Sequence, residues 1–426
     1  MKNNRKHILV ILMIFSSLAS LQAQTMLSSP YTRYGLGDLQ SNNKAYNMAL
    51  GGISLGMRSN AFVNPENPAS YTSIDTLSFI FNGGAHGQFK SLENKTIRQN
   101  SDYGSLGYLQ FGFPVTKWLK GSFGMMPFSM VGYQITDERY DENVGSYAFV
   151  YNGTGGVNKV YVGQAVELGD HLSLGFNYNY VWGDMQRDRI ALFPDSAFMR
   201  HTKILNTTSV GSHYFDFGLQ YYTDINQDVK LSVGAKFTPQ QNLSARKNQI
   251  TYTYLYTSSL MEAGQDTISF AQDQEGDIVL PMALGTGFTL SKPGHWLVGM
   301  DYNWQEWDKY EYFGLSDSLV NNHQISLGAE FVPKHTSISS YFKLITYRFG
   351  ARYGKTYLQL DDNSINEYGI SFGVGLPFRK AKSAINLGFE YGGRGTTENN
   401  LIKESFFKVT LGVSILEHWF IQSKFD

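Results

Sequence analysis

Residues 172–182 read LSLGFNYNYVW, and nearly every second position of this stretch is apolar or aromatic. The positions between them carry mainly serine, glycine and asparagine. Side chains of a β-strand point alternately to its two faces, so this pattern predicts a strand with one apolar and one polar face. A tilted strand needs about nine to eleven residues to cross a bilayer, whereas strands of soluble sandwiches are nearer five or six residues. The stretch therefore predicts a membrane-spanning strand.

The same alternation recurs along the chain, at 229–237, 296–304, 325–331, 368–378, 385–391 and 407–415. Tight links fall near residues 116–117, 169–170, 226–227, 292–293 and 379–382. Longer polar links lie between them, at 92–102, 138–156, 187–207, 259–274, 309–321, 359–365 and 395–401. Short and long links alternate nearly throughout, with 334–340 longer than expected on the short side. Outer-membrane barrels have short periplasmic turns and long external loops, so the links indicate the same class as the strands.

Counting strands with this parity predicts an all-β fold, a transmembrane antiparallel β-barrel of about fourteen strands over residues 76–416. The predicted spans are 76–91, 103–115, 117–137, 157–168, 171–186, 208–224, 228–258, 275–291, 294–308, 322–333, 341–358, 366–378, 383–394 and 402–416. Residues 147–151 are open to a second interpretation. We take them as part of a loop hairpin, and the alternative is a barrel of sixteen strands.

The chain begins with a predicted export signal over residues 1–23. Lys2, Arg5 and Lys6 form its positive region, residues 8–15 form its apolar run, and cleavage is expected after Ala23. Removal of the signal leaves a formal net charge of −4. No later segment approaches the roughly 18 apolar residues of a membrane helix. Residues 417–426 are expected to form a periplasmic tail.

Composition excludes several other classes. Only 17% of the residues are charged, 15% are aromatic, 43 are glycines and none is cysteine. Disulfides and thiolate sites are therefore excluded, and the net charge of −1 gives no basic surface for nucleic acid. The nine histidines show no metal-ligand spacing, and residues 350–356 are one residue short of a phosphate loop and lie in a strand pattern. We predict no metal, no cofactor and no enzymatic activity.

Residues 24–75 differ from everything that follows. Two glycines, Gly51 and Gly52, precede two Asn-Pro pairs in the run Asn64-Pro65-Glu66-Asn67-Pro68-Ala69. Proline lacks an N–H and restricts the residue before it, so this run blocks regular structure. A fourteen-strand barrel has a lumen too wide for side chains alone to fill, and its inward positions are often small, at Gly175, Gly234, Gly299, Gly328, Gly369, Gly373 and Gly412. Residues 24–75 are predicted to fill the lumen as a hatch. The alternative for residues 24–75 is an ordinary surface loop. The alternative for the inward glycines is that they only relieve crowding at bends of the sheet.

A small-residue segment, an Asn-Pro-Ala motif at Asn67-Pro68-Ala69 and a long alternating barrel together resemble the FadL-type outer-membrane transporters of hydrophobic compounds. The resemblance covers the architecture of the whole mature chain. It implies an N-terminal hatch that ends at the Asn-Pro-Ala motif, a location in the bacterial outer membrane and passive uptake of a hydrophobic small molecule such as a fatty acid or aromatic compound. It also implies an inward kink of the third strand, which opens the wall sideways to the membrane.

Pro127 lies near the middle of the third predicted strand, 117–137. A proline inside a strand cannot donate its ladder hydrogen bond, and an unpaired carbonyl facing lipid costs several kcal/mol. We therefore predict that the wall opens or bends here. The predicted lateral opening comprises Met125, Met126, Pro127, Phe128, Ser129 and Met130, whose soft thioethers suit an apolar path. A local bulge with no transport role is the alternative.

Two classes of function stay open from the sequence. The first is an uptake channel with a hydrophobic ligand and outer-membrane lipid as its partners. The second is a barrel that serves as an accessory or shuttle subunit of a secretion or outer-membrane assembly complex. Bound lipid in the purified protein favours the first, and stable co-purification with a large complex favours the second.

Overall fold

The computed structural model describes residues 29–40, 44–195, 199–256, 262–334, 340–378 and 383–418. The predicted signal peptide and residues 419–426 of the predicted tail lie outside this range. No helix within it is long and apolar enough to span a membrane.

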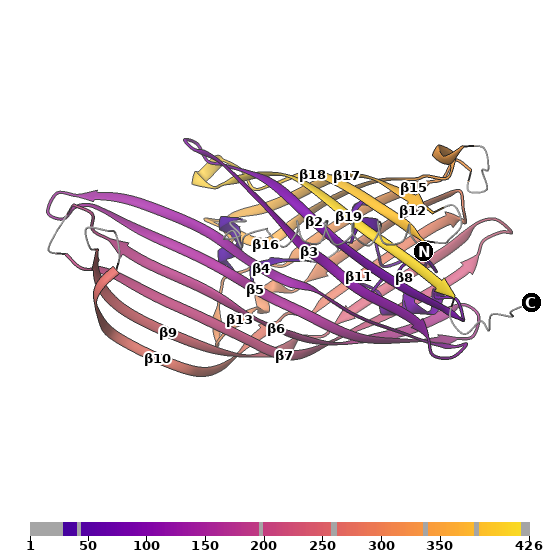
Figure 1. The fold of residues 1–426 in the computed structure, drawn as a ribbon, viewed down its shortest axis with the longest axis horizontal. Helices are drawn as coiled ribbons and strands as arrows, with labels where there is room; N and C mark the ends of the chain where they lie inside the picture. The colour runs from indigo at the N-terminus through magenta and orange to yellow at the C-terminus, as the bar shows by residue number, and fades with distance from the viewer. Residues whose placement is uncertain are drawn as a thin grey trace, which may run out of the picture.

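Fourteen antiparallel spans close into a barrel, because the last strand pairs with the first long one (Figure 1). The long strands are β2 (Ser78–Glu93), β3 (Arg98–Pro114), β4 (Leu119–Asp141), β5 (Gly145–Leu168), β6 (Leu172–Leu192), β7 (His201–Asp224), β8 (Lys230–Thr238), β9 (Gln241–Tyr256), β10 (Glu262–Leu280), β11 (Ala283–Lys292), β12 (Trp296–Gln305), β15 (Asn322–Phe331), β16 (Thr346–Leu360), β17 (Asn363–Pro377), β18 (Ala384–Arg394) and β19 (Lys403–His418).

Two of the fourteen spans are each divided by a proline. Pro239 separates β8 from β9, and Pro281 separates β10 from β11. The halves keep matching partners, since β8 pairs with β11 and β9 pairs with β10. Proline lacks the N–H that a strand interior needs, which explains a break at both positions. The predicted count of fourteen is confirmed.

Several predicted loops are wrong because strands continue through them. In the predicted loop 138–156, β4 and β5 run on and leave only residues 142–144 as a turn. Residues 147–151 pair with both β4 and β6, so they lengthen a strand rather than add one. Strands β6, β7 and β10 extend in the same way into the predicted loops 187–207 and 259–274. A long extension of the wall at one end, here called the extended end, is thus formed by the neighbouring strands β4, β5, β6, β7, β9 and β10 (Figure 1, left).

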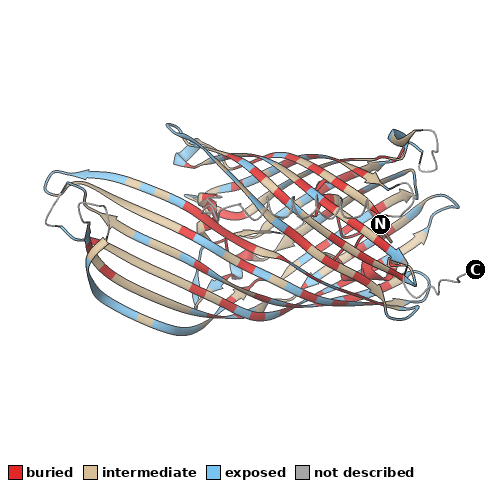
Figure 2. Ribbon diagram, in the orientation of Figure 1, coloured by how far each residue is buried: buried red, intermediate tan, exposed pale blue. Residues whose placement is uncertain are grey.

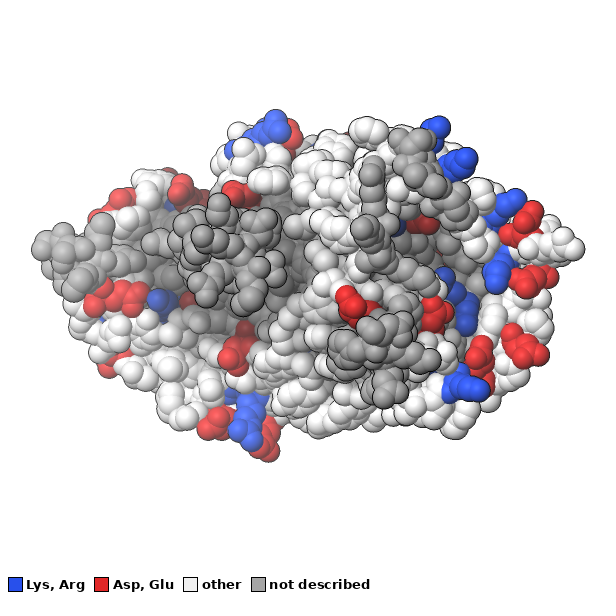
Figure 3. All heavy atoms as spheres, turned by 45° about the vertical axis from the view of Figure 1, so that its right-hand side comes forward, with Lys and Arg blue, Asp and Glu red and all other residues white. Residues whose placement is uncertain are grey.

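The outer face of the barrel is apolar and aromatic. Outward side chains of neighbouring strands form hydrogen-bonded pairs such as Tyr178 with His213 (2.6 Å) and Tyr302 with His323 (2.7 Å). Exposed apolar residues such as Phe215 and Val298 lie on the same face. On the face shown in Figure 3, Lys, Arg, Asp and Glu are dense at the right-hand end and sparse over the middle. Such a band between aromatic residues is typical of a surface that contacts lipid.

The N-terminal segment, residues 29–40 and 44–74, lies against the inner side of the strands (Figures 1 and 2). It contains η1 (Pro30–Arg33), β1 (Asp38–Leu39), α2 (Ala45–Met48) and η2 (Pro68–Ser73). Six of the seven glycines named in the sequence analysis meet it closely, and Gly369 instead lies beside Glu390 and Arg352. A Cβ at Gly234, for example, would overlap the carbonyl of Leu55.

The remaining short elements lie in connections between long strands. They are η3 (Trp307–Lys309), β13 (Glu311–Tyr312), β14 (Leu315–Ser316), η4 (Tyr341–Lys343) and η5 (Glu398–Asn400). The connection 306–321 pairs with β10 through β13, and its Trp307 is fully buried and stacks on Tyr357 at 4.4 Å. This connection and the first part of the N-terminal segment share one large apolar cluster.

Candidate functional site

The Asn-Pro-Ala motif begins a short helix and fixes a neighbouring loop. Asn67 is the N-cap of η2, where its Oδ1 accepts a hydrogen bond from the backbone N–H of Ala69 (3.2 Å). Its Nδ2 donates to the carbonyl of Leu55 (2.8 Å), while Asn64 donates to the preceding carbonyl, Ser54 (2.7 Å). The first Asn-Pro pair is therefore a second anchor for the same loop, because each asparagine satisfies a different buried carbonyl.

The loop that follows Gly51 and Gly52 docks on the barrel wall. Both glycines have positive φ angles, which glycine adopts at little cost, and Gly51 donates its N–H to Ser371 Oγ (3.0 Å). The carboxylate of Asp301 on β12 accepts the N–H groups of Ser54 (2.6 Å) and Leu55 (2.9 Å). The sequence analysis did not select Asp301. What could have indicated it in the sequence is that an acidic residue stands at an inward position of a strand pattern.

The first part of the N-terminal segment pairs with the wall as a strand. Strands β3 and β4 pair from Pro114 with Lys120 as far as Leu109 with Met125, and no further pair joins these two fully described strands. Beyond that point the edge of β4 pairs with β1, and Gln40 donates its N–H to the carbonyl of Phe128 (2.9 Å). The N-terminal segment therefore takes the place of β3 along this part of β4.

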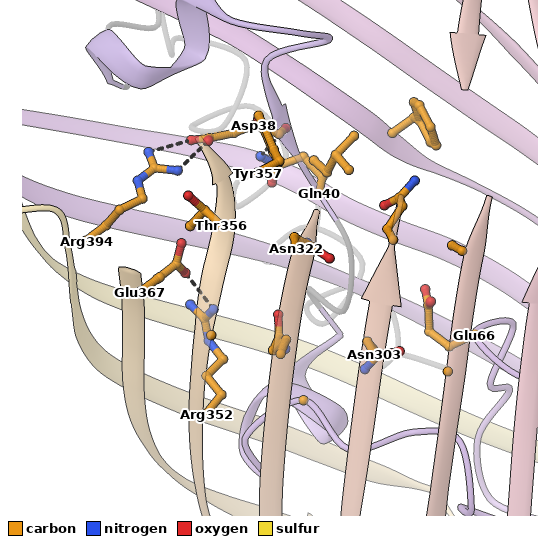
Figure 4. Close-up of a pocket in the computed structure, with 18 of the residues that line it drawn as sticks. Asp38, Gln40, Glu66, Asn303, Asn322, Arg352, Thr356, Tyr357, Glu367 and Arg394 are labelled. Carbon is orange, nitrogen blue, oxygen red and sulfur yellow. Dashed lines mark hydrogen bonds and ion pairs between the residues drawn. The ribbon is translucent and has the colours of Figure 1, made fainter. Parts of the chain in front are cut away.

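An ion cluster joins β1 to the neighbouring strands β2, β18 and β19. Arg394 on β18 contacts the carboxylate of Asp38 (2.7 Å) and that of Glu404 on β19 (2.8 Å), as Figure 4 shows for Asp38. Lys90 on β2 lies 3.7 Å from Asp38 and 3.8 Å from Glu404. We call Asp38, Lys90, Arg394 and Glu404 the Arg394 cluster. Breaking one partner out of such a buried set costs several kcal/mol, because the other charge is left unpaired.

A cavity of about 340 Å³ separates the N-terminal segment from part of the wall. It reaches the unpaired stretch, because Tyr103 of β3 and residues 126–128 of β4 both line it. Its other lining residues include many ionisable side chains, among them Glu66, Lys159, Asp216, Lys236, Arg352, Glu367, Glu390 and Lys408. Arg352 pairs with Glu367 and, at 2.7 Å, with Glu390. The cavity is thus a charged chamber with one aromatic and thioether side.

The residues predicted to form a lateral opening lie around this stretch. Met125 is 39% exposed on the outer face, whereas Met126 is 7% exposed and packs inside. Pro127 pairs with Asn158 of β5, and the register shifts between Pro127 and Ser129, which is a bulge. Phe128 packs on Tyr214 at 5.7 Å. The bulge that the alternative interpretation expected is therefore present here, and a lateral opening stays a prediction.

No group of three or more His, Asp or Glu side chains is placed to hold a metal ion in the described ranges. The buried carboxylates of the lumen instead contact backbone N–H groups, as at Asp301, or basic side chains, as at Glu404.

Solved structures with a similar fold include transporters and channels for aromatic hydrocarbons. The Ralstonia pickettii toluene transporter TbuX superposes with a TM-score of 0.58 at 14% identity, covering 88% of this chain and 98% of that one. The CymD monoaromatic hydrocarbon channel gives 0.56 at 13% identity over 90% and 99%. A Pseudomonas aeruginosa FadL homologue gives 0.52 at 12% identity over 90% and 98%. The barrel is FadL-like, as predicted from the sequence.

The particular family is identified by a sequence family model. The model described as BamG matches residues 5–426, so the chain belongs to the BamG family. No functionally curated protein matches the chain.

Two carboxylates of the N-terminal segment make its docking dependent on pH. Burial raises the pKa of Asp38, but Arg394 and Lys90 lower it more, to about 2. Burial likewise raises the pKa of Glu66, while Lys236, Lys44 and Lys159 lower it to about 2. Both values lie below those of the released segment, so each carboxylate stabilises docking above about pH 4.5. This stabilisation, roughly 2 to 3 kcal/mol each, is lost as the pH falls towards 2.

We expect the conductance of the purified barrel in planar bilayers to be low at pH 7 and to rise between about pH 4.5 and 2. The Asp38→Asn variant is expected to conduct more than the wild type already at pH 7. A wild-type conductance that stays constant down to pH 2 would contradict the assignment of these ion pairs to docking.

Proposed function

We propose that the chain is an outer-membrane uptake channel for hydrophobic small molecules, in which ligand leaves the lumen sideways between β3 and β4. Residues 24–75 act as its hatch, the tight turns face the periplasm and the extended end faces outside. The FadL-like fold and the apolar outer band support this placement. Neutral hydrocarbons cross a bilayer readily, so a wall that delivers them directly into lipid suits such a ligand.

One observation carries the lateral route. The ladder between β3 and β4 stops at Leu109 and Met125, and the cavity extends to this place between Tyr103 and residues 126–128. The pairs β17–β18, β19–β2 and β6–β7, by contrast, are joined along most of their length. In lipid an unpaired backbone group costs several kcal/mol, so an interrupted ladder persists only where something else satisfies it. Residues 38–40 do so on the inner side of β4.

Replacing Pro127 tests the route. The Pro127→Val variant gains an N–H and loses the fixed φ angle, so β3 and β4 are expected to pair beyond Met125. Uptake of radiolabelled toluene or oleate into cells is expected to fall by about tenfold, equivalent to roughly 1.4 kcal/mol. Pro239→Val, at the break between β8 and β9, is the matched control. Uptake at the wild-type rate in a folded Pro127→Val barrel would exclude the lateral route.

A second candidate function rests on the extended end. From Gly264 to Glu275, nearly every residue of β10 is exposed on both faces, including Ile268 and Phe270 at 63% and 60%. A strand with a free edge and exposed apolar side chains is suited to contact another protein. This favours an accessory subunit of an outer-membrane complex. Its test is native purification of wild type and Phe270→Lys, in which only the wild type is expected to remain in a large assembly.

A further inference from the structure

An apolar groove of about 780 Å³ lies on the outer face of the barrel, from β6 across β7, β8, β11 and β12 to β15. Residues of these strands line it, and Phe217, Phe237 and Leu284 among them are exposed members of the apolar outer band. Its volume falls within the roughly 300–1,000 Å³ of small-molecule pockets. The groove and the charged cavity therefore lie on opposite faces of the wall.

The register of the strands explains the groove. Ala235 of β8 is directly opposite Leu219 of β7 and Thr286 of β11. Directly opposite residues of an antiparallel pair point to the same face of the sheet, so Ala235 and Thr286 place two small side chains next to each other. The neighbouring row is large, with the opposite residues Phe217, Phe237, Leu284 and Trp304. A low row beside a high row leaves a depression that crosses the strands.

Side chains that line the groove are less exposed than others of the outer band. Phe237 and Tyr302 are 39% and 37% exposed, whereas Phe349 on β16 and Ile370 on β17 are 55% and 65% exposed. A hydrocarbon chain that lies along the groove thus meets side chains beneath it and beside it. Dispersion attraction grows with the number of such contacts, so the chain is held more firmly there than over the rest of the band.

The border of the groove towards the extended end is polar. There the ladder of β7 passes from β8, at Phe217, to β9, at Val210. The side chain of Gln241 bridges this passage, because it accepts from the N–H of Phe215 (2.8 Å) and donates to its carbonyl (3.2 Å). His323 lines the groove at its β15 end. Polar side chains next to a row of aromatic residues are typical of the level at which lipid head groups begin.

We propose that this groove is a binding site for a membrane lipid, which lays one acyl chain over Ala235 and Thr286 and has its head group beside Gln241 and His323. The occupant follows from the location, because the groove opens onto the apolar outer band and is continuous with the surface that contacts lipid. An extended apolar chain matches a groove that crosses several strands. The site does not require uptake, and only its leaflet, the outer one, rests on the orientation given under the proposed function.

Photo-crosslinking locates the lipid. The purified full-length protein is reconstituted into nanodiscs with a phosphatidylethanolamine that carries a diazirine in one acyl chain, and cross-linked peptides are identified by mass spectrometry. Cross-links are expected to concentrate on residues 233–237 and 284–288. Cross-links spread evenly over the outer band, with Phe349 and Ile370 labelled as strongly, would overturn the site.

Filling the groove tests its affinity for the lipid. Ala235→Phe and Thr286→Phe each place a ring where the acyl chain lies, and both side chains face outward, so the barrels are expected to fold and to show heat-modifiable migration. In native mass spectrometry the wild type is expected to retain one lipid at a detergent concentration that strips the others. Each variant is expected to bind this lipid about tenfold more weakly. Ala351→Phe, at an exposed alanine of β16 outside the groove, is the matched control and should retain it.

Full lipid retention by a folded barrel that carries both Ala235→Phe and Thr286→Phe would contradict the proposal. The same spectra reveal other occupants. A second copy of the chain seated in the groove would appear as a dimer that retains no lipid and that both phenylalanine variants abolish, and this result would also overturn the lipid site. None of these readouts depends on uptake, so failure of the lateral route is separately visible through Pro127→Val.

Discussion

A barrel that lacks residues 45–58 is expected to conduct as an open pore. The deletion removes α2, the glycine loop and Arg58, which together contact β15–β19, β11, β8 and β7. Without them a fourteen-strand lumen has no filler in that zone, and its inward glycines leave it wider still. Single-channel conductance in planar bilayers is expected to rise at least about tenfold, and large polar antibiotics are expected to enter cells.

The barrel itself is expected to survive this deletion, because its long strands pair with one another and residues 38–40, which pair with β4, are retained. Heat-modifiable migration on gels measures whether the barrel of the deletion variant is folded. Deleting residues 397–400, which include η5, is the control and should leave conductance low. Unchanged conductance in a folded barrel without residues 45–58 would refute a hatch role for the N-terminal segment.

A disulfide between Leu39→Cys and Ser129→Cys is expected to stop uptake. These residues are opposite each other in the antiparallel pair of β1 and β4. Opposite residues in such pairs have Cα atoms about 4.5–5.5 Å apart, within the roughly 4.4–6.8 Å that disulfides span. The chain has no cysteine of its own, so no other disulfide can form within it. It fixes residues 38–40 on the edge that ligand must pass in the proposed route.

Uptake of radiolabelled toluene is expected to fall to background in the oxidised double variant and to return on adding a reducing agent. The two single-cysteine variants are controls and should transport normally under both conditions. Undiminished uptake by the fully oxidised protein would mean that β1 does not need to leave β4. The lateral route would then have to pass beside β1.

The sequence predicted the barrel well because membrane strands are governed by local rules. Residues 172–182 must alternate, since one face meets lipid and the other meets the lumen. The same alternation gave the fourteen spans. It failed at 138–156 and 259–274, where strands leave the membrane and no face needs to be apolar, so their polar residues were interpreted as loops.

Only part of the candidate site could be predicted from the sequence. Asn64, Asn67 and the glycines near Gly51 were selected because proline and glycine carry local conformational signals. Asp301 and Arg394 were not, because a single polar residue at an inward position is ordinary in a barrel. Their partners Ser54 and Asp38 lie 247 and 356 residues away in sequence.

The sequence by itself determined that strands of membrane-crossing length alternate along the chain and that a compact segment precedes them, because these features depend on periodicity and on backbone restrictions within a few residues. Tertiary structure alone decided that β3 leaves β4 at Met125 and that residues 38–40 take its place. Those outcomes depend on which distant groups meet when the barrel closes around the N-terminal segment, and no local pattern encodes such a meeting.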